Sequence, residues 1–282
     1  MIPSRVIGGR YVVLGGLGDG ALGPVWRAQD RLTGRQVAVK ELHLPAGLGA
    51  PEHALFRERL LREARGAARL GTTGLLAVHD VVVDSGVDHV VTELLDARRL
   101  SDAVARSGPL QGPQAVETAR ALLETLRAAH EGEIVHGAIR PRAVLLVRGG
   151  RVVLSDVGLA QALDHRRLMG REQLAANPDF HAPERITGGP ATAATDLWSL
   201  GATLFFAVEG RGPFMRADVT ATRAAVLDGP VPEARCGTPL AGVIAALLRR
   251  EPGERPSAAD ALAMLATGSR AGRRPFWRRF LA

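Results

Sequence analysis

Lysine is almost absent from this chain of 282 residues. Of its 36 basic residues, Lys40 is the one lysine and the others are arginine. A lysine offers a compact ammonium group on a flexible stem, which a planar guanidinium does not replace. The sequence therefore singles out Lys40 as a functional residue. A stray lysine codon in an arginine-biased gene is the alternative interpretation.

Cysteine is equally scarce, since Cys236 is the single one. This excludes an internal disulfide and a cysteine-based zinc cluster, and it suits a reducing cytoplasm, which is the location we expect. No apolar run approaches the roughly 18–20 residues that a membrane helix needs. Arg5 and Arg10 interrupt the N-terminal stretch, so no signal-peptide core is expected there.

Acidic residues are missing from the last part of the chain, because none follows Asp260. The formal net charge is +7, and five arginines near the C-terminus supply most of it: Arg270, Arg273, Arg274, Arg278 and Arg279. The rest of the chain is nearly balanced in charge. We therefore expect no nucleic-acid-binding surface on the folded body.

A glycine-rich turn lies just before Lys40. Gly18, Gly20 and Gly23 separate two strand-like runs at residues 11–16 and 25–29, and a third run at 37–40 ends at the lysine. A dinucleotide-binding turn would instead open a helix, but proline, valine and tryptophan follow the last glycine here. The pattern predicts a loop that covers phosphate groups, with Lys40 as their counter-charge.

The remaining chain changes character near residue 96. Before it, a helix is predicted at residues 51–70, followed by strands at 76–83 and 88–94. After it, helices dominate, with two short strands at 143–147 and 152–155. The predicted helices cover residues 100–107, 113–131, 195–209, 217–227, 239–250 and 257–266.

Six motifs occur in an order that resembles the bacterial Ser/Thr protein kinases of the eukaryotic type, from about Tyr11 to Leu265. They are Gly18-x-Gly20-x-x-Gly23-x-Val25, Val37-Ala38-Val39-Lys40, Ser155-Asp156-Val157-Gly158, Ala182-Pro183-Glu184, Asp196-Leu197-Trp198-Ser199-Leu200-Gly201 and Glu254-Arg255-Pro256. The resemblance implies an α+β fold of two lobes. The β-rich N-lobe would span residues 1–95, the mainly helical C-lobe 96–268, and a basic-aromatic tail 269–282.

The resemblance also implies an ATP site. Lys40 would reach the phosphates and be positioned by Glu63, with Glu58 as the substitute if Glu63 is only a solvated helix residue. Asp156 would hold Mg²⁺ as a cofactor of ATP, unless it is a simple turn residue. The implied nucleotide-binding residues are Leu17, Gly18, Gly20, Gly23, Val25, Ala38, Lys40, Glu93, Leu95 and Leu145.

Four further residues have structural roles in the family that this chain resembles. Glu184 and Arg255 would form a buried pair, and Asp196 would tie the catalytic loop to a central helix. His136 would support that loop from behind.

The chain departs from the family in its catalytic loop, residues 136–143. Ala138 replaces the base that accepts the substrate proton, and Ala143 replaces the amide ligand of a second Mg²⁺. Losing a positioned base costs roughly 10²–10⁴ in rate. Gly137 and Arg140 replace a phosphate-gripping arginine and a lysine, and Asn177 replaces a threonine.

The activation segment, residues 157–181, contains no Ser, Thr or Tyr. We therefore predict a pseudokinase that binds ATP and serves an unidentified protein partner as a regulatory or scaffolding module in signalling. The alternative is an active Ser/Thr kinase in which Asp164 or His165 supplies a displaced base.

The tail is a separate question. Phe276 and Phe280 share a helical face opposite two arginines, an arrangement that suits contact with an anionic membrane surface. The alternatives are docking of these aromatic residues on the C-lobe and a tail without fixed structure.

Overall fold

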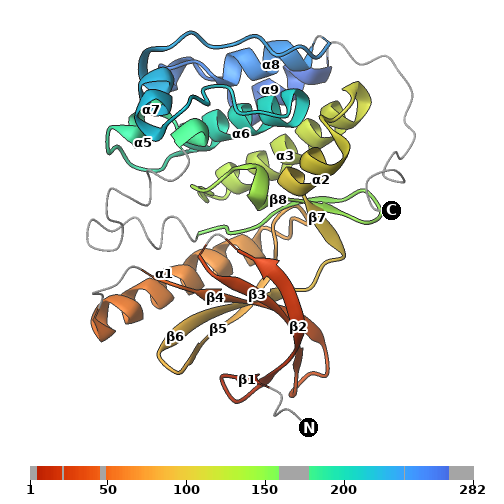
Figure 1. Ribbon diagram of the computed structural model, residues 1–282, viewed down its shortest axis with the longest axis vertical. Helices are drawn as coiled ribbons and strands as arrows, with labels where there is room; N and C mark the ends of the chain where they lie inside the picture. Colours follow the sequence, from red (N-terminus) through yellow and green to blue (C-terminus); the bar gives the residue numbers. More distant parts are fainter. Residues whose placement is uncertain (1–4, 21, 45–48, 159–177, 238, 267–282) are drawn as a thin grey trace.

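The computed structural model describes residues 5–20, 22–44, 49–158, 178–237 and 239–266. It has a small lobe built on a curled sheet and a larger helical lobe, drawn below and above in Figure 1. The predicted α+β fold with two lobes is confirmed. None of the helices in the described ranges is both long and apolar enough to cross a membrane.

The small lobe contains a six-stranded antiparallel sheet in the order β1-β2-β3-β4-β6-β5. The central strand β6 is buried over five consecutive residues, so both of its faces are covered, whereas β2 becomes exposed toward its C-terminal end. Their bounds are β1 (Val6–Ile7), β2 (Tyr11–Asp19), β3 (Pro24–Asp30), β4 (Gln36–Leu42), β5 (Val78–Asp84) and β6 (Val87–Glu93).

Helix α1 (Ala50–Arg69) lies beside this sheet, as Figure 1 shows. Phe56 and Leu60 are fully buried, and they pack with Leu42 of β4 and Val90 of β6 in one apolar cluster. Burial of side chains of this size contributes about 1.5–3 kcal/mol each. This cluster fixes the helix against the strand that ends near Lys40.

The large lobe begins with a three-stranded sheet of β7 (Ala97–Arg99), β8 (Val144–Val147) and β9 (Val152–Leu154). Helix α6 (Ala193–Glu209) is buried along most of its length, with Trp198 and Leu200 in the main core. The other α-helices that the structure describes in this lobe are α2 (Leu100–Ser107), α3 (Gly112–Glu131), α5 (Pro183–Ile186), α7 (Val219–Asp228), α8 (Leu240–Leu247) and α9 (Ala258–Ala266).

The two lobes are joined by backbone hydrogen bonds as well as by the chain between β6 and β7. The amide of Leu76 donates to the carbonyl of Leu154 at 2.9 Å, and the amide of Leu154 donates to the carbonyl of Gly74 at 2.8 Å. Residue 154 directly precedes the Ser155-Asp156 motif. These bonds therefore place that motif at the boundary between the lobes, opposite Lys40.

Candidate functional site

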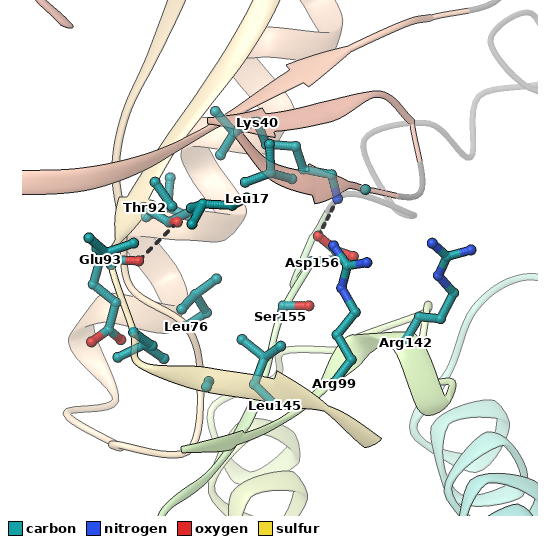
Figure 2. Close-up of a pocket in the computed structure, with 18 of the residues that line it drawn as sticks. Leu17, Lys40, Leu76, Thr92, Glu93, Arg99, Arg142, Leu145, Ser155 and Asp156 are labelled. Atoms are coloured by element: carbon teal, nitrogen blue, oxygen red, sulfur yellow. Dashed lines mark hydrogen bonds and ion pairs between the residues drawn. The ribbon is translucent and has the colours of Figure 1, made fainter. Parts of the chain in front are cut away.

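A cavity of about 310 Å³ lies between the lobes, under β2 and β3 and above β7 and β8. Figure 2 shows Leu17 and Leu145 on opposite sides of the cavity. Val25 of β3 and Ala38 of β4 add apolar lining from the small lobe. Figure 2 shows Lys40 and Asp156 meeting at one end and Thr92 and Glu93 at the other. A flat apolar slot with backbone groups at one end and charges at the other suits a nucleotide.

The structure brings most of the predicted nucleotide residues to this cavity. Those that line it are Leu17, Gly20, Val25, Ala38, Lys40, Glu93, Leu95 and Leu145, together with Asp156. Gly18 and Gly23 do not line it. They shape the turn instead, because their φ angles are +104° and +152° and a Cβ on Gly23 would lie 2.5 Å from the carbonyl oxygen of Glu41.

Lys40 forms a tight ion pair with Asp156, with 2.6 Å between Nζ and Oδ1. Both side chains are largely buried, being 12% and 17% exposed. Burial raises the pKa of the Asp156 carboxyl, but the charge and hydrogen bond of Lys40 outweigh burial and the net pKa is lowered. The carboxylate is therefore held ionised at neutral pH.

Glu63 is not the partner of Lys40 in this structure. Its ion pair is with the neighbouring Arg62, at 3.8 Å, and the alternative residue Glu58 is exposed. The physical reason lies in the 155–158 segment, where Asp156 has a φ of +70° and its carboxylate reaches the lysine from across the cleft. The role of Glu63 in positioning Lys40 stays a prediction.

The 136–143 loop is anchored by Asp196 at the start of α6. The Asp196 carboxylate accepts hydrogen bonds from the amides of His136 and Gly137, each at 2.7 Å. His130 lies 3.1 Å from the same carboxylate through Nε2. Burial lowers the pKa of His136, whose Nδ1 accepts from the Ala138 amide at 3.3 Å. The loop backbone is thus held firmly by a buried carboxylate.

The oxygen donors near the cavity fit a magnesium site poorly. Three carboxylates line the cavity. Asp156 is ion-paired with Lys40, and Glu93 pairs with Arg151 at 3.2 Å. Asp102 accepts a hydrogen bond from the Ser101 hydroxyl at 2.9 Å. Ala143 has no side-chain oxygen, while the Ser155 hydroxyl donates to the Ala143 carbonyl at 3.3 Å. Within the described ranges no three His, Cys, Asp or Glu residues group as metal ligands. Mg²⁺ prefers several converging oxygens.

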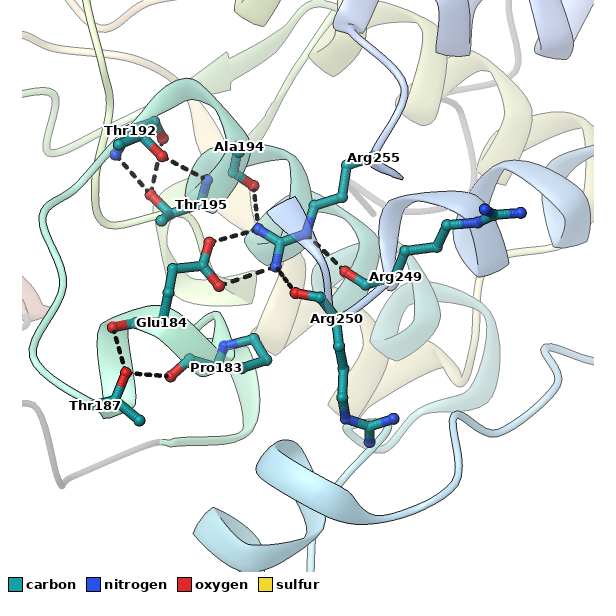
Figure 3. A network of polar contacts seen from close by, with 9 residues as sticks. All are labelled: Pro183, Glu184, Thr187, Thr192, Ala194, Thr195, Arg249, Arg250 and Arg255. Atoms are coloured by element: carbon teal, nitrogen blue, oxygen red, sulfur yellow. Dashed lines mark hydrogen bonds and ion pairs between the residues drawn. The ribbon is translucent and has the colours of Figure 1, made fainter. Parts of the chain in front are cut away.

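Glu184 and Arg255 form an ion pair, shown in Figure 3, in which the Arg255 side chain is buried and the Glu184 side chain is partly exposed. The guanidinium donates to both carboxylate oxygens, at 2.6 and 2.9 Å, and to the carbonyl of Ala194 at 2.8 Å. It also lies 5.1 Å from the ring centroid of Trp198. The pair links α5 and the segment between α8 and α9 to the first turn of α6.

Sequence reasoning missed four charged residues that line the cavity: Arg98, Arg99, Asp102 and Arg142. Arg99 precedes the predicted helix at 100–107, which is α2, and Arg142 lies within the 136–143 loop. Apolar Leu76 and polar Thr92 and Ser155 were also missed. Strand pairing of Arg99 with Leu145 brings these segments together, and no local pattern signals such a pairing.

Several predicted features lie outside the described residues. These are Asp164 and His165 as displaced bases, Asn177, and the tail at 269–282.

A two-lobed fold with a glycine-rich strand turn, a lysine facing an aspartate across a cleft and an anchored loop below it defines a protein-kinase architecture. The model of the protein kinase domain family matches residues 11–265, so the chain belongs to this family. It is 27% identical to the serine/threonine-protein kinase PrkC of Bacillus subtilis over 85% of this chain and 36% of that protein.

Other relatives are also bacterial. The chain is 31% identical to the probable serine/threonine-protein kinase pknA2 of Bifidobacterium longum, over 75% of this chain and 28% of that protein. It is 29% identical to the serine/threonine-protein kinase PknA of Mycobacterium tuberculosis, over 95% of this chain and 63% of that protein. The chain thus spans about a third of the length of PrkC and pknA2.

Proposed function

We propose that this domain binds ATP but transfers its γ-phosphate poorly, and that it acts in signalling as a regulatory or scaffolding module for a protein partner. The observation that carries the proposal is the state of the 136–143 loop. Asp196 holds its backbone at 2.7 Å hydrogen bonds, yet the loop presents methyl groups at Ala138 and Ala143. A methyl group neither accepts a proton nor coordinates a metal.

ATP binding is supported by the wall of the cleft that the small lobe forms, where the residues expected at the motif positions are present. Leu17, Val25 and Ala38 offer apolar lining, and Lys40 is the single lysine that the chain retains. Gly20 leaves the lysine room, since a Cβ at this position would lie 2.9 Å from Lys40 Cε. Neutral drift would have changed both walls of the cleft.

An active Ser/Thr protein kinase is the second candidate. It is favoured by the resemblance to proteins named as serine/threonine kinases over most of the chain. In that case Asp164 or His165 would replace the missing base. We further propose a cytoplasmic location with peripheral membrane contact through residues 269–282. Liposome co-sedimentation of the chain with and without these residues tests the contact, which is excluded if both sediment alike.

The decisive experiment measures ATP binding and phosphoryl transfer on the same preparation. We expect ATP to raise the melting temperature of the wild type but not of Lys40→Ala, with transfer at background. Restoring both lost groups, as Ala138→Asp with Ala143→Asn, should raise transfer above the wild-type level. Robust wild-type transfer that Ala at 164 or 165 abolishes would establish the active kinase instead.

A further inference from the structure

Two arginines of the large lobe extend into the charged end of the cavity. Arg99 is the last residue of β7 and directly precedes α2, and Arg142 lies in a short 3-10 helix (Pro141–Ala143) of the altered loop. Figure 2 shows both guanidinium groups extending from the large lobe toward the region of Lys40 and Asp156. Arg99 is partly buried and Arg142 is exposed.

These two positive charges are not neutralised by a carboxylate, in contrast to their neighbours. Lys40 and Asp156 neutralise each other at 2.6 Å, and Glu93 is paired with Arg151. Arg142 donates to a neutral group, the carbonyl of Asp19, at 3.4 Å. For Arg99, no acidic partner within 4.0 Å is found among the described residues. Cations left without counter-ions in a cleft attract an anion.

The place of these charges matters because the oxygen ligands for a divalent cation are lacking there. The side chain of Ala143 is a buried methyl group, and Arg142 is its immediate neighbour. Asp156 is engaged by the lysine. The wall of the cleft that the large lobe forms therefore lacks a metal-binding group at position 143 and presents guanidinium groups instead.

We propose that Arg99 and Arg142 bind the polyphosphate of a nucleoside triphosphate directly, so that this domain holds its nucleotide without a divalent metal. The inference rests on the proposed nucleotide binding and specifies how the phosphate charge is balanced. A guanidinium group has five N–H donors in a planar fork that matches phosphate oxygens, and its charge persists at every physiological pH.

The contact between Arg142 and Asp19 suits this role. Asp19 ends β2, within the glycine-rich turn, so the arginine crosses the cleft from the large lobe to the glycine-rich turn of the small lobe. One N–H bond to a carbonyl leaves the other donors of the guanidinium available for phosphate oxygens. Arg142 would then fasten the glycine-rich turn over a bound polyphosphate.

The test is calorimetric titration with ATP and with adenosine, each in EDTA and in Mg²⁺. The proteins are the wild type, Arg99→Gln, Arg142→Gln and the control Arg127→Gln. Arg127 lies on α3, is 51% exposed and pairs only weakly with Glu131, at 3.9 Å. It therefore reports the effect of removing one positive charge from the surface.

We expect the wild type to bind ATP equally well in EDTA and in Mg²⁺. Arg99→Gln and Arg142→Gln should each lose about tenfold or more in ATP affinity, the scale of one charged hydrogen bond, with adenosine affinity unchanged. Arg127→Gln should behave as the wild type.

ATP binding that requires Mg²⁺ would overturn this inference and leave the proposed function intact. Equal losses of ATP and adenosine affinity in the two variants would also overturn it, because the arginines would then support the fold and not the phosphates. Failure of the wild type to bind ATP or adenosine under either condition would overturn the proposed function itself.

Discussion

Gly158 packs against Glu63 so closely that a Cβ built on the glycine would lie 2.3 Å from the Glu63 Cβ. This contact joins the segment after Asp156 to helix α1. Gly158 also has a φ of +73°. The segment that presents Asp156 to the lysine therefore depends on a residue without a side chain.

The substitution Gly158→Ala should lower the free energy of unfolding by about 2–4 kcal/mol, because it combines left-handed backbone strain with overpacking. Urea denaturation measures it. Gly71→Ala is the control, since Gly71 has a φ of +61° but a Cβ there would contact nothing within 4 Å. It should cost only the backbone strain of about 1–2 kcal/mol. If both variants lose the same unfolding free energy, α1 moves away from the added methyl group without cost, and the close contact does not contribute to stability.

Asp196→Asn should destabilise the domain by about 3 kcal/mol. The amide keeps one accepting oxygen where the carboxylate serves the amides of both His136 and Gly137, so a buried donor loses its partner. Asp218→Asn is the matched control, because Asp218 caps α7 through a single bond to Ala221 and asparagine caps equally well. Chemical denaturation of both variants gives the comparison, and similar values would contradict a special role for Asp196.

Arg255→Leu should lower the free energy of unfolding by about 3–5 kcal/mol, because Glu184 loses the partner of its carboxylate. The Arg255 side chain is 0% exposed, whereas Arg249 is 57% exposed in its pair with Glu254 at 3.5 Å. Arg249→Leu should therefore change stability by less than about 1 kcal/mol. A melting curve of Arg255→Leu that matches the wild type would refute the importance of this network.

Asp179 should make stability depend on pH in the acidic range. Burial raises the pKa of its carboxyl to about 6, although the amide of Phe214 donates to it at 2.6 Å. The folded state then holds a proton that the unfolded state, with an ordinary pKa of 3.8, releases. Stability should fall by up to about 3 kcal/mol as pH rises from about 4 to 6.

The replacement Asp179→Asn removes this titration while keeping an oxygen that accepts from Phe214. The difference in unfolding free energy between variant and wild type should therefore grow in favour of the variant from pH 4 to pH 6. Urea denaturation at pH 4.5 and 7.0 measures it. Parallel pH profiles for the two proteins would show that Asp179 titrates normally in the fold.

Most helices could be predicted because their side chains repeat with helical periodicity. The helix predicted at residues 51–70 is α1 (Ala50–Arg69), and that at 100–107 is α2 (Leu100–Ser107). The strands β1 and β7 were missed. They have two and three residues, and their existence depends on pairing with β2 and β8 rather than on their own residues.

The sequence by itself determined the class of fold and the residues that stand at each motif position. Motif order, the single lysine and the alanines at 138 and 143 are properties of the chain alone. Only the tertiary structure decided that Lys40 meets Asp156 and that Arg99 and Arg142 share its cavity. Such partners come from different lobes and distant segments, so their contacts depend on how strands pair and lobes stack, which no local pattern records.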